Sequence, residues 1–340
     1  MAEASGKTND TPATRRLRGH TAIATSCIAS RNEDIVYVSS ETEVKVFDVH
    51  MLASWKPLES YNYNKEEINQ ITCNSKSSFL AAADDGGDIK IIDIHQKCLY
   101  KTLRAAHESI CSSVQFLPWR PWEVITGGLD SKLIMWDFSK GRPFKVMDLG
   151  KSDPDSSSNA GQCFNPAFVH AIAVPEVDML DKIDKICVVA RGDGVVDVIN
   201  IESEFKAAKS KSSSSLKKGG QSKSNGSVSS SNSEIEDQNQ RTRLRLDYSF
   251  GGHTAAVSCV AFSVFGEKGR YIISGGNDKA VKVWNWSKFS KTDQICNKDG
   301  FLHLNINLSR KVNWLCTTPT DSENLVVCDT SKIVKVYTVA

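Results

Sequence analysis

A short pattern of alternating residues recurs along the chain, and it constrains the fold more than any other feature of the sequence. Each copy alternates apolar residues with other residues and ends in an aromatic or apolar residue followed by an acid, an amide or a threonine. The copies occupy residues 44–48, 89–93, 133–137, 196–200, 281–285 and 334–338. Because side chains alternate between the two faces of a strand, this period of two predicts a half-buried β-strand at each copy. The chain is therefore expected to be all-β and built from repeats.

The spacing of the copies gives the size of the repeat. The residue before the terminal acid stands at positions 47, 92 and 136, so the first two intervals are 45 and 44 residues. Two copies also contain a histidine, a hydroxyl residue, an aspartate and a tryptophan at matching distances. These sets are His107, Thr126, Asp130 and Trp136, and His253, Ser274, Asp278 and Trp284. A period of about 40–45 residues that ends in an aromatic–Asp strand is typical of the blade of a WD-repeat propeller, and the sequence resembles that family.

The resemblance implies that each four-residue set forms a buried chain from the turn aspartate through the histidine and the hydroxyl to the indole N–H. A buried aspartate is tolerated only where hydrogen-bond donors pair with it. A catalytic His–Asp pair is the alternative interpretation of the same residues. A catalytic constellation has no reason to recur once per repeat, so the repetition favours the structural role. The chain also lacks a G-x-S-x-G motif, a phosphate-binding glycine loop and a Cys/His cluster, so we expect no enzyme, no cofactor and no metal site.

Composition excludes further classes of function. A formal net charge of +2 gives no reason to expect a specific nucleic-acid or membrane partner, and no apolar run approaches the roughly 20 residues that span a bilayer. The polar N-terminus lacks the apolar segment of a secretory signal. The cysteines form no CxxC pair and most stand singly in apolar runs, as buried cysteines do in a reducing compartment, so we expect a cytoplasmic or nuclear protein. These are Cys27, Cys73, Cys111, Cys187, Cys259, Cys316 and Cys328.

The repeats predict one propeller domain over residues 14–340, after a disordered segment at residues 1–13. A Ser/Lys-rich insertion at residues 205–243 has too few large apolar residues to fold, and residues 150–162 are expected to form a flexible loop. The lysines of the insertion could form a nuclear-import or anion-binding patch, although a solvated linker is the favoured interpretation. These lysines are Lys206, Lys209, Lys211, Lys217 and Lys218.

The number of blades departs from the family pattern. Six strand copies are recognisable, whereas WD-repeat proteins of this type have seven blades. Residues 20–47 read as the opening of one blade joined near Arg31–Asn32 to the end of the next, so a splice form or gene model that lacks about one blade is our hypothesis. Residues 14–18 (TRRLR) are expected to complete the last blade as its fourth strand, because such closure hides the edges of an open ring.

Several stretches resemble one subgroup of the family more closely. They are residues 66–93, 109–130, 165–174, 274–284 and 311–316. The motif FLPWRPWEV in the second stretch indicates a plant member of the subgroup. The resemblance implies a non-enzymatic interaction scaffold that serves as a substrate receptor for cullin-4 RING ubiquitin ligases. Such receptors dock on an adaptor, damaged-DNA-binding protein one, through a blade tail of aromatic–Asp–x–Arg, whose arginine is offered to acidic or carbonyl acceptors.

The first three tails of this chain do not carry that arginine. Their fourth positions hold His50, His95 and Ser139 instead. Histidine can donate a hydrogen bond but is mostly neutral near pH 7, which weakens the inference without removing it. The alternative is that the two histidines are ordinary exposed turn residues. The candidate docking residues are Asp48, His50, Asp93, His95, Asp137 and Arg142.

A second class of function stays open at this point. The propeller could be a reader or scaffold in a chromatin or phosphoprotein complex, without a ligase, that binds its partner on the central face of the disc. Such a reader needs basic or aromatic side chains at the inner turns, and Arg191 is the candidate in the sequence. The two hypotheses differ in the proteins that should co-purify with the chain.

Overall fold

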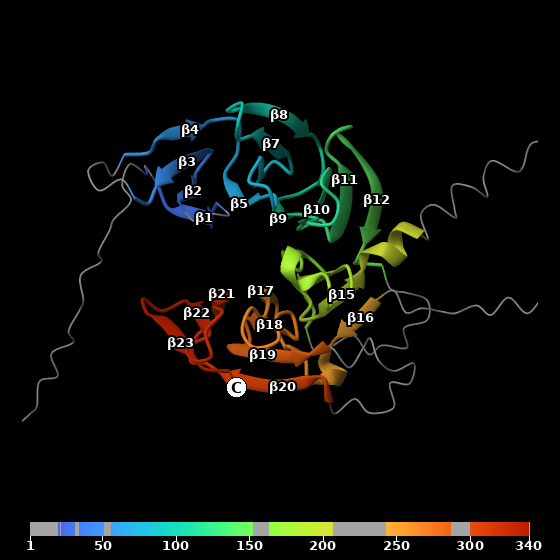
Figure 1. The fold of residues 1–340 in the computed structure, drawn as a ribbon. Coiled ribbons are helices and arrows are strands. Elements are labelled where there is room, and N and C mark those ends of the chain that lie inside the picture. The colour runs from blue at the N-terminus through green and yellow to red at the C-terminus, as the bar shows by residue number, and fades with distance from the viewer. Residues whose placement is uncertain are drawn as a thin grey trace, which may run out of the picture.

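Six antiparallel β-sheets surround a central channel in the computed structural model, which describes residues 20, 22–30, 34–50, 56–151, 163–206, 243–286 and 300–339 (Figure 1). Each sheet is one blade, and its strands are hydrogen-bonded in chain order. The first strand of each blade lies nearest the channel, as the labels β1, β5, β9, β17 and β21 show in Figure 1. The all-β propeller predicted from the repeats is confirmed, and it has six blades.

The first three blades are complete four-stranded sheets. Blade 1 consists of β1 (Ala24–Ala29), β2 (Ile35–Ser40), β3 (Glu43–Asp48) and β4 (Glu59–Tyr61). Blade 2 consists of β5 (Ile68–Cys73), β6 (Phe79–Asp84), β7 (Ile89–Asp93) and β8 (Cys98–Leu103). Blade 3 consists of β9 (Cys111–Phe116), β10 (Glu123–Gly128), β11 (Lys132–Asp137) and β12 (Arg142–Asp148).

The other three blades include the only three-stranded sheet among the described residues. Blade 4 consists of β13 (Val169–Ala173), β14 (Ile186–Arg191), β15 (Val196–Asn200) and β16 (Arg243–Leu246), with short 3₁₀ turns η1 (Val177–Met179) and η2 (Tyr248–Phe250) beside it. Blade 5 consists of β17 (Val257–Phe262), β18 (Tyr271–Gly276), β19 (Ala280–Asn285) and β20 (Leu302–Asn307). Blade 6 consists of β21 (Val312–Thr317), β22 (Leu325–Asp329) and β23 (Val334–Tyr337).

The repeated sequence pattern coincides with the third strand of every blade. Five of these strands are buried in the middle of their sheets, as in β7, where Ile89, Ile91 and Ile92 are fully buried. The alternation predicted a half-buried strand, but neighbouring blades cover both faces, so the residues between the apolar positions are also enclosed. In β7, for example, Lys90 is buried with its ammonium on Asp88 at 2.9 Å.

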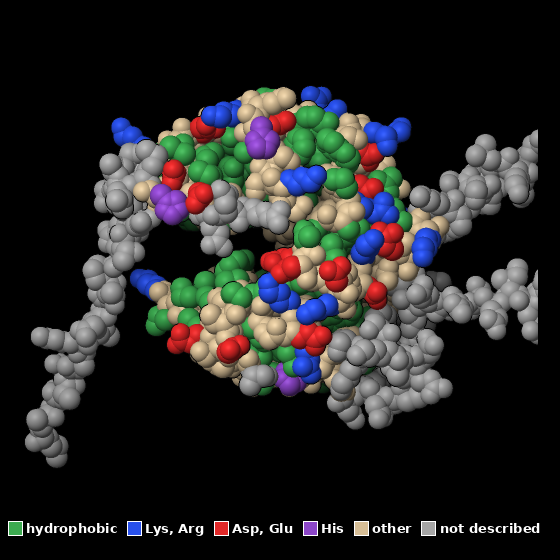
Figure 2. Space-filling model, in the orientation of Figure 1, with side chains coloured by type: hydrophobic (Ala, Val, Ile, Leu, Met, Phe, Trp, Pro, Cys, Tyr) green, Lys and Arg blue, Asp and Glu red, His purple; other side chains and the backbone are tan. Residues whose placement is uncertain are grey.

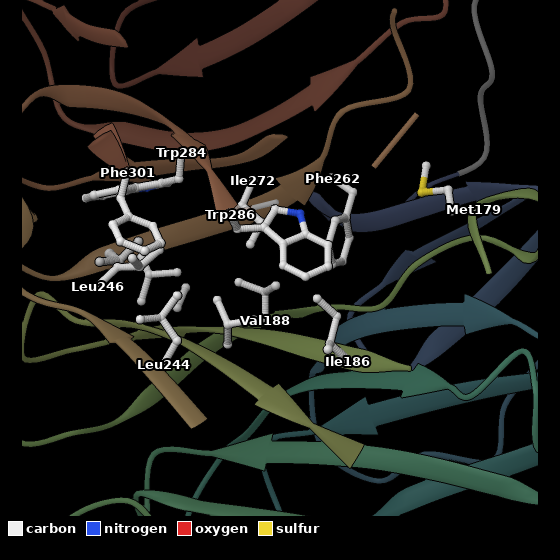
Figure 3. Packing of buried hydrophobic residues seen from close by; sticks show 14 residues of the cluster. Met179, Ile186, Val188, Leu244, Leu246, Phe262, Ile272, Trp284, Trp286 and Phe301 are labelled. Carbon is white, nitrogen blue, oxygen red and sulfur yellow. The ribbon is translucent and has the colours of Figure 1, made fainter. Parts of the chain in front are cut away.

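The core lies between the blades rather than inside them. Each apolar cluster is formed by two successive blades, from the pair of blades 1 and 2 to the pair of blades 5 and 6. Figure 3 shows one such seam, where Trp284 and Trp286 of blade 5 face Val188 and Leu244 of blade 4. Hydrogen bonds also link successive inner strands, as between the Ser112 hydroxyl and a carbonyl of β13 at 2.5 Å.

The cysteines are mostly enclosed by these seams. Cys111, Cys187 and Cys259 are buried, while Cys73, Cys98, Cys163, Cys316 and Cys328 are intermediate. Burial raises the pKa of the Cys73 and Cys259 thiols to about 12, so they stay protonated at neutral pH. The prediction of burial is wrong for Cys27, which is exposed because β1 lies at the junction between blade 1 and blade 6.

The junction between blade 6 and blade 1 is the least covered part of the ring. Among the residues that the structure describes, β23 pairs only with β22, and Val334 and Val336 on it are 59% and 50% exposed. The cross-strand register places Trp314, Cys328 and Val334 in one row of the sheet, and Cys316, Val326 and Val336 in the next. This face of blade 6 is therefore apolar and largely unpacked, whereas its other face packs on blade 5.

Several sequence-based predictions fall at the limits of the described chain. Residues 14–18, the join at Arg31–Asn32 and most of the two insertions lie outside the described residues. On either side of the join, β1 and β2 pair in one sheet, so the flanking residues belong to a single blade. At the start of the longer insertion, a helical turn at residues 201–206 carries Phe205 into the core between blades 3 and 4, and Arg243 at its end opens β16.

Candidate functional site

Blade 3 contains a complete hydrogen-bonded chain from a turn to its third strand. The His107 ring lies with Nδ1 2.9 Å from Asp130 Oδ1 and with Nε2 2.9 Å from the Thr126 hydroxyl. The indole N–H of Trp136 donates to the same hydroxyl at 3.2 Å. The carboxylate of Asp130 also accepts the backbone N–H of Lys132, which closes the tight turn between β10 and β11.

Blade 5 repeats this chain with a serine in the place of the threonine. His253 lies 2.9 Å from both Asp278 Oδ1 and the Ser274 hydroxyl, and the Trp284 indole N–H donates to that hydroxyl at 2.9 Å. The Asp278 carboxylate accepts the backbone N–H of Thr254 at 3.1 Å. The structure thus brings together all four residues of each predicted set.

The direction of these bonds fixes which histidine nitrogen carries the proton. The Trp136 N–H can only donate, so the Thr126 oxygen accepts it and donates its own proton to His107 Nε2. The Nδ1–H then donates to the Asp130 carboxylate, which leaves the ring neutral. Burial lowers the pKa of His107 and His253, although the carboxylates beside them oppose that effect. Burial would raise the pKa of Asp278, but hydrogen bonds from His253 and from the backbone N–H groups of Thr254 and Ala280 lower that pKa.

These two hydrogen-bonded chains leave no catalytic group available to a substrate. Every polar atom that a general base or nucleophile would use is already bonded within the blade, and His107, Thr126, His253 and Ser274 are buried. The geometry therefore holds a loop, a turn and two strands together. Among the residues that the structure describes, no group of three or more His, Cys, Asp or Glu side chains is arranged to hold a metal ion.

Blade 1 retains only part of this arrangement. His20 packs against Phe47, with ring centroids 5.4 Å apart. The turn between β2 and β3 has no aspartate in register, and His20 Nδ1 is buried without a hydrogen-bond partner. Burial lowers the pKa of this histidine as well, so blade 1 keeps the ring without the polar chain.

Blade 4 replaces the histidine chain by a buried ion network that the sequence analysis missed. The carboxylate of Asp197 is fully buried and receives Arg191 Nη1 at 2.7 Å and Arg243 Nε at 3.0 Å. Arg191 also binds Asp193 in the turn at 3.0 Å. Burial would raise the pKa of Asp197, but the two guanidinium groups lower it. Arg191 and Arg243 stand on either side of the long insertion, so no local spacing marks them as partners.

This network overturns the interpretation of Arg191 as a partner-binding residue. Its side chain is 2% exposed and its guanidinium is held by Asp193 and Asp197. The central channel, a cavity of about 890 Å³ whose opening is visible in Figure 2, is lined by the inner strands of all six blades. Within the described residues its lining contains no lysine or arginine, and its aromatic side chains are Phe262 and Trp314, on blades 5 and 6. The ring of basic or aromatic side chains expected for a phosphopeptide reader is therefore not found there.

The tails of blades 1 and 2 each hold an aspartate inside the turn and a histidine outside it. Asp48 Oδ1 accepts the backbone N–H of His50 at 2.8 Å, and Asp93 accepts a backbone N–H of its own turn in the same way. His50 and His95 are both exposed. His50 Nε2 also lies 2.9 Å from Asp34, which is itself half exposed.

The tail of blade 3 is a tighter turn with a more strongly held carboxylate. Burial opposes ionisation of Asp137, but hydrogen bonds from Lys140 and Ser139 lower its pKa to about 2. The Ser139 hydroxyl donates to the Asp137 carboxylate at 2.5 Å and so closes the turn. It does not supply the outward-facing charge that a docking arginine would. Arg142 opens β12 opposite Asp137 in the register and is exposed.

These three tails lie on one loop side of the propeller, which we call the tail face: the turns at residues 48–50, 93–97 and 137–141. Lys97 of the second tail contacts blade 1, because it pairs with Glu59 while the Tyr63 hydroxyl donates to its carbonyl at 3.3 Å. Phe138 in the third tail contacts blade 2 through aromatic packing against Phe79 and Tyr100. The candidate docking residues are thus arranged along neighbouring blades.

Comparison with known proteins agrees with this geometry. The family model "WD domain, G-beta repeat" matches residues 97–137 and 244–285. These are the two segments that contain the complete hydrogen-bonded chains. These two segments of the chain are therefore similar to WD repeats. WD-repeat propellers are in general non-enzymatic scaffolds for protein–protein interaction.

A curated relative extends the likeness to one kind of WD-repeat protein. The chain is 34% identical over 157 residues to the "WD repeat-containing protein 53 homolog" of Dictyostelium discoideum. The alignment covers 43% of this chain and 41% of the relative, less than half of either protein. The subgroup resemblance found in the sequence agrees with this relative, while the plant origin and the loss of one blade stay predictions.

Solved structures give the same fold at low sequence identity. The WD40 repeats of RRP9 superpose with a TM-score of 0.64 at 13% identity, over 95% of this chain and 78% of that one. The WD40 propeller domain of Doa1 superposes with a TM-score of 0.60 at 12% identity, over 93% and 79%. At these identities the likeness concerns the WD-repeat propeller alone. Separately, none of the described helices is long and apolar enough to cross a membrane.

Proposed function

We propose that this WD-repeat propeller is a substrate receptor of a cullin-4 RING ubiquitin ligase and docks on the ligase adaptor through its tail face. The arrangement of His50 and His95 carries the proposal. Both side chains are exposed at the same position of consecutive blade tails, each beside an aspartate that fixes its turn. A neutral histidine ring can donate one hydrogen bond to a carbonyl or carboxylate of the adaptor. His50 would exchange its contact with Asp34, which lies 2.9 Å from its Nε2, for the contact with the adaptor.

The scaffold role follows from the WD repeats, because WD-repeat propellers are in general scaffolds for protein–protein interaction. The ligase role is supported by the likeness to WD repeat-containing protein 53 homologues and by the position of the tails. The absence of the tail arginine makes the histidines the residues to test. We further propose a cytoplasmic or nuclear location, where cullin-4 ligases act.

Affinity purification followed by mass spectrometry tests the partner class directly. Under this proposal, the tagged chain recovers the adaptor and cullin-4. Histones or phosphoproteins without ligase subunits would instead favour the reader or scaffold without a ligase. The described channel lining, which has no lysine or arginine, and the buried Arg191 disfavour that function.

The double variant His50→Ala/His95→Ala tests the residues. We expect at least a tenfold loss of recovered adaptor, with a thermal midpoint close to that of the wild type, because both side chains are exposed. His303→Ala is the matched control, since His303 is an exposed histidine of blade 5. Adaptor recovery that is the same in the double variant and the control excludes the two histidines as the contact.

A further inference from the structure

Five aromatic side chains of blades 2 and 3 form one cluster at the edge of the tail face. They are Phe79, Tyr100, Phe116, Trp122 and Phe138. Phe138 is fully buried at the centre, with its ring centroid 5.5 Å from that of Trp122 and 5.4 Å from that of Phe79. Its backbone N–H donates to the Trp122 carbonyl at 3.0 Å, which ties the tail turn of blade 3 to the loop before β10.

Two members of this cluster remain at the surface. Trp122 is 46% exposed and Tyr100 is 38% exposed, and their ring centroids lie 6.4 Å apart at an angle of 32°. In the described part of the chain, neither the Trp122 indole N–H nor the Tyr100 hydroxyl has a hydrogen-bond partner. Figure 2 shows hydrophobic side chains reaching the surface between β8 and β11. The buried rings hold the two exposed ones in place, so little side-chain entropy remains to be lost on binding.

The charges beside the two rings are unbalanced. Lys101 lies across the tail turn of blade 3, with its Cδ 3.1 Å from the position that a Cβ on Gly141 would take. Arg142 follows this turn and is exposed. Neither cation has an ion pair among the described residues, whereas the acids nearby are already engaged: Asp137 by Lys140 and Glu123 by Arg120. The surface next to the rings is therefore positively charged.

We propose that Tyr100 and Trp122, with Lys101 and Arg142 beside them, form a docking site for an acidic segment of a partner protein that carries one apolar anchor side chain. The anchor packs on the two rings, and the free indole N–H and phenol O–H bond to carbonyls of the segment. Carboxylates on either side of the anchor meet the two unpaired cations. Trp, Tyr and Arg are also the residues that most often dominate binding energy at protein interfaces.

A nucleic acid fits this surface less well than a peptide. Single-stranded RNA or DNA binds along a basic groove that follows several phosphates, with bases stacked on successive aromatic faces. Here two unpaired cations flank two rings, and both rings are tilted within a packed cluster. The site shares Arg142 with the candidate docking residues, but it uses neither His50 nor His95, so the two proposals are tested by different substitutions.

Selection from a phage library of random 12-residue peptides, with the purified full chain as bait, provides the probe. We expect the selected peptides to share a Leu, Phe or Trp flanked by Asp or Glu. Labelled synthetic copies are then titrated by fluorescence anisotropy at low and moderate salt. Binding should weaken at least tenfold in Trp122→Ala, weaken similarly in Lys101→Glu/Arg142→Glu, and fall with added salt.

Matched controls are available elsewhere on the molecule. Tyr248→Ala removes an exposed aromatic ring near blade 4, and Lys185→Glu reverses an exposed charge there; both should bind like the wild type. The charge-reversal variant changes one exposed and one half-buried side chain and leaves the aromatic cluster intact, so it tests the proposal even if Trp122→Ala lowers stability.

Three results overturn the proposal. The first is a selection that yields no enriched peptides, or peptides without acidic residues. The second is binding that is equal in the wild type and in Lys101→Glu/Arg142→Glu. The third is a different occupant of the same surface: a labelled 15-residue oligouridine that loses binding in Trp122→Ala, or a dimer in sedimentation velocity that this substitution dissociates. Adaptor recovery is measured separately, so failure of the ligase proposal does not affect this test.

Discussion

The Thr126 hydroxyl is the residue-scale feature on which the blade 3 chain depends, because it accepts from Trp136 and donates to His107. Thr126→Val keeps the shape of the side chain but leaves two buried polar groups unpaired. Since an unpaired buried group costs about 1–3 kcal/mol, we expect the free energy of unfolding to fall by about 2 kcal/mol or more in urea titrations. Thr102→Val is the control, because that half-buried hydroxyl has no hydrogen-bond partner among the described residues. Equal losses in the two variants contradict the assignment.

The two network histidines make stability depend on pH in a defined direction. Burial lowers the pKa of His107 and His253 in the folded protein, so the unfolded chain binds protons more readily. Their contribution to stability is complete above the ordinary histidine pKa of about 6.5 and is lost as the pH falls below it. We expect the thermal midpoint to decrease between pH 7.5 and 5.5.

The variant His107→Gln/His253→Gln checks that assignment. It should be less stable at neutral pH, yet its midpoint should change less between pH 7.5 and 5.5 than that of the wild type. Some dependence should persist, because burial also lowers the pKa of His20 and His170. A midpoint that rises on acidification, or a profile as steep as that of the wild type, argues against neutral histidines in the folded blades.

At the scale of the element, blade 4 is held by ions where blades 3 and 5 use neutral hydrogen bonds. Asp197 on β15 joins Arg191 on β14 to Arg243 on β16, so one carboxylate ties three strands. Asp197→Asn removes the buried negative charge that both guanidinium groups contact, and we expect a loss of about 3–5 kcal/mol in the free energy of unfolding. Asp181→Asn, at an exposed position of the same blade, should change it little. Denaturant titration compares the two, and a small loss for Asp197→Asn shows that the arginines find other partners.

Prediction from sequence succeeded where the determining information is local. Alternating apolar residues placed the third strand of all six blades, and a fixed spacing marked the His107 and His253 sets. The network of Arg191, Asp197 and Arg243 was missed because two of its strands are separated by a long insertion. The surface formed by Tyr100 and Trp122 was missed because its rings come from two blades that only the closed fold brings together. The tail aspartates were found by pattern, but only the structure shows that their carboxylates bond to their own turns.

At the scale of the whole molecule, the ring depends on how its last sheet is completed. Every other blade has four strands, whereas in the described part of the chain β23 has no partner on its outer edge, and Val334 and Val336 on it are exposed. Unpaired edges of this kind template association with other chains unless they are covered. A strand from the N-terminal residues would pair with β23 and would tie the first blade to the sixth through the chain itself.

Deletion of residues 14–18 tests this closure. If they form the fourth strand of blade 6, their loss removes a row of backbone hydrogen bonds and exposes the apolar face that includes Trp314. We expect a lower thermal midpoint, faster amide hydrogen exchange in β22 and β23, and more concentration-dependent association. Deletion of residues 2–6 shortens the same terminus by an equal length and serves as the control. The midpoint and the exchange in β23 could also stay unchanged after deletion of residues 14–18. That result would show that these residues do not cover the edge of β23.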